Sequence, residues 1–164
     1  MLRRRLYRRT RRRVGARHLT GEGIEIGALH HPFPVPDGAR VRYADRYTVA
    51  QLRQEYPELG DAPFAEVEIL SDAGTLATVA GASQDFVVAS HVLEHLPDPV
   101  GALRTWVRVV RPGGTVLLAL PDRRTGVGER GGATTVEHPL AGHADGGASA
   151  RSQRYREWAD LVGP

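Results

Sequence analysis

The sequence contains no cysteine, which excludes disulfide scaffolds, thiolate metal sites and cysteine nucleophiles. It contains no lysine either, so arginine supplies all 22 of its Lys and Arg positions. Aromatic residues make up only 6% of the 164 residues. No apolar run approaches the roughly 18 residues that span a bilayer, which excludes an integral membrane segment. Because no apolar stretch follows the charged N-terminus, we expect no secretory signal and a cytoplasmic location.

Positive charge is concentrated at the N-terminus. Residues 1–13 hold eight arginines and no acid, which exceeds the net charge of +3 and leaves the rest of the chain mildly acidic. Blocks of like charge usually stay solvated, so the arm of residues 1–20 could be a partly formed helix or a disordered tail. The alternative is contact with an anionic partner, either nucleic-acid phosphates or a membrane surface. Stacking on bases has little support, since Tyr7 is the only aromatic residue in the arm.

Short apolar segments alternate with helical patterns over residues 21–122. Strands are expected at residues 23–27, 41–45, 67–70, 85–90 and 115–120. The segment 85–90 is almost wholly apolar, which is typical of a central parallel strand covered on both faces. This alternation predicts an α/β fold, a Rossmann-like and mostly parallel sheet of about five strands with helices on both faces.

Two helices have recognisable start signals. Thr48 and Gln51 have the spacing of a capping box, and Pro57 is expected to end that helix. Asp98 followed by Pro99 predicts the start of the second helix. Residues 123–164 lose the pattern and are expected to form a loop-rich tail with a helix near residues 150–162. We therefore divide the chain into an arm (1–20), a core (21–122) and a tail (123–164).

Polar residues and glycine stand at the ends of the expected strands. They are Glu25, Gly27, Asp45, Asp72 and Ser90. Because ligands of open parallel sheets bind beyond the carboxyl ends of the strands, we expect these residues to share one site. The interval from Gly27 to Asp45 is close to the roughly 20 residues expected between a glycine turn and an acid that binds ribose hydroxyls.

The glycine turn differs from a dinucleotide fingerprint. After Gly27 the chain reads ALHHPFPVP, with no G-x-G-x-x-G pattern and few amides free to bind a pyrophosphate. This favours a nucleoside ligand without a phosphate chain. It argues against an NAD-dependent oxidoreductase, which would keep Asp45 but needs the missing glycines.

Five segments together resemble a known family. They are IEIGA (24–28), YAD (43–45), SDAGTL (71–76), DFVVASHVLEHL (85–96) and VVRPGG (109–114). Over about residues 22–122 the chain resembles a class I S-adenosylmethionine (SAM) dependent methyltransferase with a methyltransferase type 11-like domain. The segment from 85 to 114 is the most specific part of the resemblance.

The resemblance implies SAM as cofactor and assigns roles to single residues. Glu25 and Gly27 would border the methionine part of SAM, and Asp45 would hold the ribose hydroxyls. Asp72 would bind the adenine amino group, with Thr75 and Leu76 beside the ring. Ser90 and His91 would lie near the sulfonium, whereas Phe86 is expected in the core.

Histidines are the candidates for a general base, since histidine titrates near neutral pH. A base is needed only for an acceptor whose attacking atom is protonated. The candidates are His91, His95 and His138. His30 and His31 are not expected to bind a metal, because adjacent residues of an extended chain point opposite ways and no third ligand follows.

The expected sheet lacks the last two strands of the seven that are typical of the family. We therefore expect a C-terminally truncated relative, whose exposed strand edge could pair with a second copy. The sequence favours a SAM-dependent methyltransferase that acts on a small-molecule or glycan-like acceptor. The alternative is a truncated, non-catalytic SAM-fold binding protein that needs a partner chain.

Overall fold

The structure is a computed structural model that describes residues 2–122 and 137–148. Its helices are α1 (Leu2–His18), α2 (Val49–Glu55), α3 (Pro99–Val109) and α4 (Glu137–Ala144), with short 3₁₀ turns η1 (Pro57–Leu59) and η2 (Leu93–His95). Its strands are β1 (Glu22–Ile26), β2 (Arg40–Asp45), β3 (Val67–Leu70), β4 (Gln84–Ser90) and β5 (Val110–Ala119). None of the described helices is long and apolar enough to cross a membrane.

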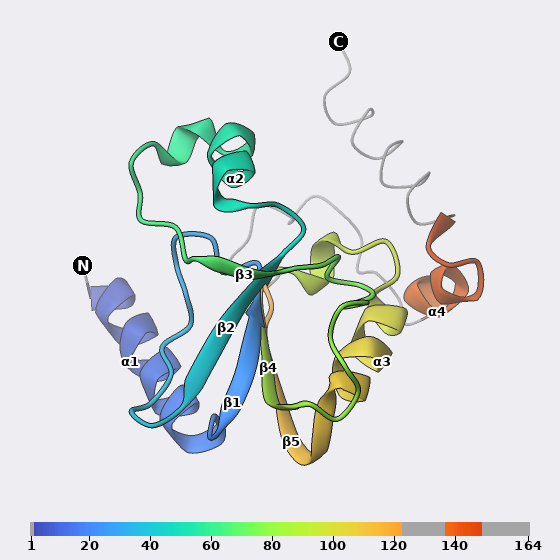
Figure 1. Cartoon of the computed structure of the whole chain (residues 1–164), viewed down its shortest axis with the longest axis horizontal. Helices are drawn as coiled ribbons and strands as arrows, with labels where there is room; N and C mark the ends of the chain where they lie inside the picture. Colours follow the sequence, from blue (N-terminus) through green and yellow to red (C-terminus); the bar gives the residue numbers. More distant parts are fainter. Residues whose placement is uncertain (1, 123–136, 149–164) are drawn as a thin grey trace.

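The five strands form one parallel sheet in the order β3-β2-β1-β4-β5 (Figure 1). The chain runs outward from β1 to β3 and then returns to the other side of β1, so the strand order reverses between β1 and β4. This confirms the predicted Rossmann-like sheet. It also locates the switch point at which open α/β sheets bind their ligands, beyond the carboxyl ends of β1 and β4.

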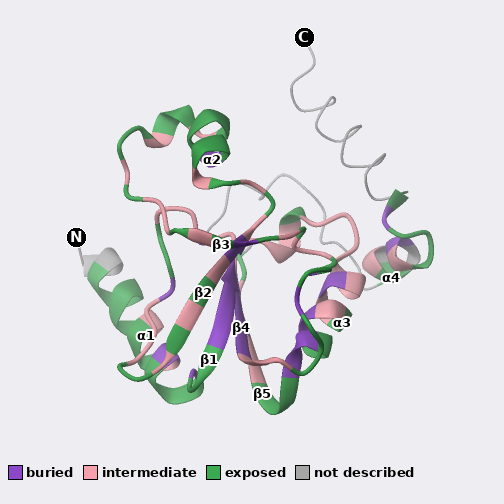
Figure 2. Cartoon of the chain, in the orientation of Figure 1, coloured by how far each residue is buried: buried purple, intermediate pink, exposed green. Residues whose placement is uncertain are grey.

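Each face of the sheet carries its own hydrophobic cluster. On the α3 face, Ile24 and Ile26 of β1 pack with Val87 of β4 and Trp106 of α3. On the other face, Phe86 and Val88 of β4 and Leu117 of β5 pack in a second cluster with Leu19 and Phe33. The inner strands are therefore buried on both sides (Figure 2), as the apolar sequence of β4 predicted.

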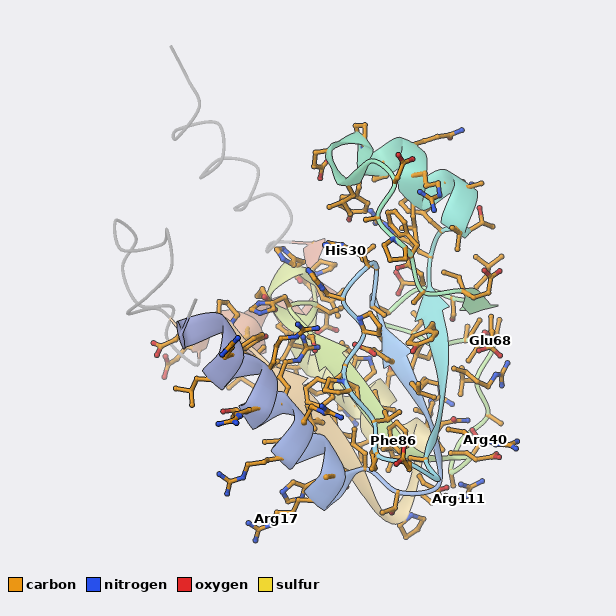
Figure 3. All side chains as sticks on the ribbon, turned by 90° about the vertical axis from the view of Figure 1, so that its left-hand side faces the viewer. Arg17, His30, Arg40, Glu68, Phe86 and Arg111 are labelled. Carbon is orange, nitrogen blue, oxygen red and sulfur yellow. The ribbon has the colours of Figure 1, made fainter. Side chains whose placement is uncertain are left out.

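The arginine-rich segment forms α1, which lies across the second face (Figures 1 and 3). Only its C-terminal part is anchored: Gly15 is buried, Leu19 just beyond the helix is fully buried, and Val14 packs against the same cluster. Most of its arginines are exposed, and Arg17 points away from the sheet in Figure 3. Of the two expected states of the arm, the structure has the helix. The domain boundary at residue 20 stays a prediction.

Both predicted helix starts are confirmed. Thr48 and Gln51 form a complete capping box at the start of α2. The Asp98 side chain accepts the Gly101 amide at 2.8 Å at the start of α3, with Pro99 in the first turn. These caps satisfy amides that the helices themselves leave unpaired.

The last strand begins earlier than the sequence indicated. We expected residues 112–114 to separate α3 from a strand at 115–120, but β5 already starts at Val110. The pairing of β4 with β5 shifts register between Gln84 and Phe86, so residues 111–114 form an irregularity inside the strand. Gly113 has a φ of +83°, which is why a glycine suits this bend. The helix expected near residues 150–162 lies outside the described residues.

Candidate functional site

The site is built where β1, β2 and β4 end. Gly27 follows β1, and its amide donates to the carbonyl of Ala44 in β2 at 3.0 Å. Its φ is +65°, and a Cβ at this position would lie 3.1 Å from Cγ2 of Val92. Glycine is therefore favoured here by backbone conformation and by space. The chain turns sharply at Gly27, directly at the switch point of the sheet.

Glu25 is buried under the segment that follows Gly27. Its side chain is 1% exposed, and both carboxylate oxygens accept the amide of Phe33, at 3.0 and 2.8 Å. Burial raises the pKa of Glu25 from 4.5 to about 7, while the Phe33 amide and the charge of Arg11 act in the opposite direction. This carboxyl group therefore secures the β1–β2 segment. In this arrangement Glu25 would act on the methionine part of SAM through the Phe33 segment. Its predicted place beside that part stays a prediction.

Asp45 ends β2 and is half-buried. Its Oδ1 accepts the amide of Tyr47 at 3.1 Å. Burial raises the pKa of Asp45, and the hydrogen bond from Tyr47 opposes this shift. A carboxylate that is partly withdrawn from water at the end of a central strand is suited to accept hydrogen bonds from ligand hydroxyl groups.

Asp72, Thr75 and Leu76 lie in the turn that follows β3. The Oδ1 of Asp72 accepts the amides of Gly74 and Thr75 at 2.9 and 3.2 Å, so this carboxylate shapes its own turn. Thr75 is exposed, whereas Leu76 is fully buried in the α3-side cluster. Leu76 therefore supports the turn from beneath. The predicted contacts of these residues with adenine stay predictions.

The end of β4 places Ser90 and His91 next to the switch point. His91 has a φ of +55°, uncommon for a residue other than glycine, and its amide donates to the carbonyl of Ala119 at 2.9 Å. Its exposed ring has Nδ1 at 3.2 Å from Oε1 of Glu94. Strained backbone of this kind clusters at functional sites.

The structure describes the side chain of only one of the other two candidate bases. His95 is exposed in η2. His138 lies in α4, and its side chain is outside the described residues.

Several buried polar atoms near this edge have no hydrogen-bond partner among the described residues. They are Oγ of Ser71, Oγ of Ser90, Nδ1 of His30 and Oε2 of Glu94. The two serines directly follow or end β3 and β4, and Figure 3 shows His30 at the upper edge of the sheet, at the opposite end from Arg111. Buried polar atoms without partners are costly, so each of them favours a ligand with donors and acceptors. Together with the turn at Gly27 and the carboxylate of Asp45, they fit the polar adenosyl and amino-acid groups of SAM.

The comparisons with known proteins decide the family. The sequence profile of a family described as a methyltransferase domain matches residues 21–118. The chain belongs to this methyltransferase family. The family agrees with the sequence prediction of SAM as the cofactor, and the position of SAM at the edge of β1, β2 and β4 stays a prediction.

Known relatives match parts of this chain. A ubiquinone biosynthesis O-methyltransferase of Paracidovorax citrulli is 35% identical over 75 residues, which cover 46% of this chain and 30% of the relative. A probable SAM-dependent methyltransferase of Mycolicibacterium smegmatis is 35% identical over 83 residues, covering 49% of this chain and 28% of the relative. The chain therefore matches less than a third of the length of these curated relatives.

A solved structure has the same fold. The SAM-dependent methyltransferase from Aquifex aeolicus aligns with a TM-score of 0.50 and 15% identity, over 83% of this chain and 76% of that one. At this identity the likeness concerns the fold. It agrees with the Rossmann-like sheet described above.

A surface hollow of about 430 Å³ lies elsewhere, beside β3 and the residues that lead into β4. Its lining includes Ile69, Val79 and Gln84, but none of Gly27, Asp45 and Ser90. Ligands of such sheets bind at the switch point rather than at an outer strand, so this hollow lies away from the predicted cofactor site.

The prediction that His30 and His31 point opposite ways is wrong. Their ring centroids lie 4.0 Å apart, because the chain turns between Ala28 and His31 instead of running extended. Within residues 2–122 and 137–148, no group of three or more metal-ligating side chains is found.

The sequence reasoning missed three residues near this site. Arg11 of α1 donates to the carbonyl of His31 at 3.3 Å, the Phe33 amide is held by Glu25, and Ser71 has the unpaired hydroxyl described above. Arg11 is one of eight arginines in the first 13 residues, so no local pattern distinguishes it. Ser71 had a signal, since it stands next to Asp72 at a strand end.

Proposed function

We propose that the chain binds SAM at the carboxyl edge of β1, β2 and β4 and catalyses methyl transfer to a small-molecule or glycan-like acceptor. The family match over residues 21–118 carries this proposal, and the half-buried Asp45 and the unpaired Ser90 hydroxyl at the switch point support it. The match does not support the alternative of a non-catalytic binding protein. When bound, SAM supplies an activated methyl group, so the contribution of the chain is to bind, to align and to exclude water.

The residues divide this work by position. Asp45 would accept the two ribose hydroxyls, and the turn at Gly27 would let the backbone approach the methionine part. Ser90 would offer its hydroxyl near the sulfonium, and Asp72 and Thr75 would border the adenine. Glu25 would act through the Phe33 segment, because its oxygens are already used by that amide.

Among the candidate histidines whose side chains the structure describes, His91 has the arrangement best suited to a general base. It stands at the end of β4, and the carboxylate of Glu94 lies 3.2 Å from its Nδ1. A carboxylate on one ring nitrogen orients the imidazole and favours the tautomer in which the other nitrogen can accept a proton. That proton would come from a hydroxyl or amine of the acceptor.

Calorimetry with SAM and with its demethylated product tests the binding half of the proposal. We expect both to bind the wild-type chain. A screen of hydroxylated small molecules and glycans with methyl-labelled SAM then tests transfer. Failure of both cofactors to bind would contradict the proposal. Binding without methyl transfer to any acceptor would support the cofactor site and would overturn the proposed reaction.

A second proposal concerns α1. Arg5, Arg9, Arg13 and Arg17 recur at intervals of four, are all exposed, and belong to a helix that contains no acid. Like charges at this spacing destabilise a helix, and an anionic partner would relieve the repulsion. Leu6 and Tyr7 are 65% and 50% exposed on the same helix. Arginines beside exposed apolar side chains favour an anionic lipid surface as the partner.

A cytoplasmic location and pairing of copies through a sheet edge stay predictions. In the described sheet, β3 and β5 are the two edge strands.

A further inference from the structure

One side of the β1–β2 segment is held by α1. The Nη2 of Arg11 donates to the carbonyl of His31 at 3.3 Å, and its guanidinium carbon lies 4.7 Å from the centroid of the Phe33 ring. Gly15, one turn further along, is so close that a Cβ there would lie 2.3 Å from the carbonyl oxygen of Pro34. Helix and segment are therefore in direct contact at two successive turns of α1.

The other side of the same segment is held by β1. Phe33 is 4% exposed, and its amide is bound by both oxygens of Glu25. Residues 27–39 contain no helix in the structure, so helical hydrogen bonds do not fix this connection. Its position depends on the contacts made to it, which include Glu25 from below, Arg11 with Gly15 from above, and the amide of Ala65, which donates to the carbonyl of Leu29 at 2.7 Å.

The segment starts at the switch point. Gly27 is its first residue, and His30 stands in it with a buried Nδ1 that has no partner among the described residues. A shift of residues 31–34 would be transmitted over a few bonds to both positions. The segment thus connects α1 to the edge at which we place the cofactor.

We propose that Arg11 is a positioning residue of the cofactor site: from α1 it fixes residues 30–33, and with them the turn at Gly27, in the arrangement that binds SAM. The inference rests on the proposed cofactor site. The role belongs to Arg11 and not to the charge of α1 in general, and Arg12, which is exposed on the same helix, serves as the matched control.

The test uses the full chain and the demethylated product of SAM, so that binding is measured without turnover. Arg11→Ala should weaken binding by about tenfold to a hundredfold, the range expected for losing a hydrogen bond from a charged group. Arg11→Lys keeps the charge but not the planar guanidinium, and should restore part of the affinity. Arg12→Ala removes the same charge and should bind as the wild type does.

Gly15→Ala disturbs the same contact by another route. Alanine favours the helix itself, so α1 is not weakened, yet the new methyl group has no room against the Pro34 backbone. This variant should also lose affinity for the product. Hydrogen exchange of residues 28–34 should accelerate in Arg11→Ala and Gly15→Ala, and in Arg11→Ala the urea midpoint of the whole chain should stay close to that of the wild type.

Wild-type affinity in both variants would overturn the inference and leave the proposed function intact. A loss of affinity that only parallels a fall in the urea midpoint, without local exchange at residues 28–34, would also overturn it, because the effect would then be general stability. If the wild-type chain itself does not bind the product, the proposed cofactor site is wrong and the inference is wrong with it. This result differs from the two above, because in those the wild-type chain binds the product.

Discussion

Two acids beside the switch point have different surroundings and therefore different tasks. Glu25 is buried away from water, and both of its oxygens accept the Phe33 amide. Asp45, one strand further out, is half-buried and accepts the amide of Tyr47 with one oxygen. The pKa of each is raised by burial, but Glu25 is the one that reaches about 7. Asp45 is thus the carboxylate suited to meet a ligand, and Glu25 the one that holds the wall of the site.

Removal of the Asp45 carboxylate should weaken cofactor binding. In Asp45→Ala we expect the affinity for SAM and for its demethylated product to fall by about tenfold or more, because charge-assisted hydrogen bonds to two hydroxyls are lost. Calorimetry measures this change. Asp37→Ala is the matched control, since Asp37 is an exposed acid at the opposite end of β2. Equal affinities of Asp45→Ala and wild type would contradict the assigned role.

Glu25 should make stability depend on pH. Because its folded pKa of about 7 lies above the ordinary 4.5, the folded chain keeps a proton that the unfolded chain releases in this window. The free energy of unfolding should therefore fall as pH rises from about 4.5 to about 7, by about 3 kcal/mol, and change little from this cause above that range.

In Glu25→Gln this contribution disappears, while the amide oxygen can still accept from Phe33. Urea unfolding of both chains at several pH values between 5 and 8 is the measurement. As pH rises, the free energy of unfolding of the wild type should fall relative to that of Glu25→Gln. If the free energies of unfolding of the two chains ran parallel between pH 5 and 8, Glu25 would be ionised in the folded chain over this range. That result would contradict the prediction.

At the scale of elements, α3 does more than cover the sheet. The connection from β3 to β4, residues 71–83, consists of turns and is fastened by side chains of α3. The indole N–H of Trp106 donates to the carbonyl of Ala73 at 2.8 Å. Arg108 donates to the carbonyls of Val79, Thr75 and Leu76 at 3.0–3.2 Å. The turn that contains Asp72 therefore depends on a helix that follows it by some 30 residues in the chain.

Loss of the Trp106 hydrogen bond should destabilise this connection. Trp106→Phe leaves the Ala73 carbonyl without its partner and a small cavity beside a fully buried ring. We expect the free energy of unfolding to fall by about 1–3 kcal/mol, as measured by urea unfolding. Val107→Ala on the exposed side of α3 should change it by less than about 0.5 kcal/mol. If Trp106→Phe left the free energy of unfolding unchanged, the hydrogen bond from Trp106 would not be what stabilises this connection.

At the scale of the whole molecule, most of the positive charge of α1 is exposed on the surface of the helix, while Arg11 contacts the segment beside the site. The helix α1 lies on one side of the sheet (Figure 1), whereas Asp45 ends β2, Asp72 follows β3 and Glu94 lies in η2 after β4. A membrane or another anionic surface could therefore be bound through α1 while the acidic edge stays accessible to a small acceptor.

Binding of α1 to anionic lipid should depend on salt. We expect the wild-type chain to cosediment with vesicles that contain phosphatidylserine at low ionic strength, and to be released as salt screens the arginines. Arg9→Glu combined with Arg13→Glu should abolish the binding without loss of affinity for the SAM product. Equal binding to neutral vesicles would contradict the electrostatic mechanism. Binding to nucleic acid but not to vesicles would replace the lipid proposal.

The sequence by itself determined the sheet, the order of its elements along the chain and the carboxyl ends of the strands, whereas the start of β5 differed from the prediction. Apolar alternation, the capping box at Thr48 and the Asp98–Pro99 signal are local, and local chemistry decides where helices and strands form. Because parallel strands end at one edge, the convergence of Gly27, Asp45 and Ser90 followed from the same pattern. The methyltransferase family was predictable for the same reason, since its motifs lie at these strand ends.

Only the tertiary structure decided which side chains already have partners within the chain. It showed that Glu25 is bound to the Phe33 amide, that Leu76 lies in the core, and that Arg11 of α1 reaches His31. These contacts join residues that are not neighbours on one helix or strand, and they depend on burial and on the distance between elements. Neither quantity is expressed in the periodicity or spacing of a single segment, so no reading of the chain could have distinguished Arg11 from the arginines beside it.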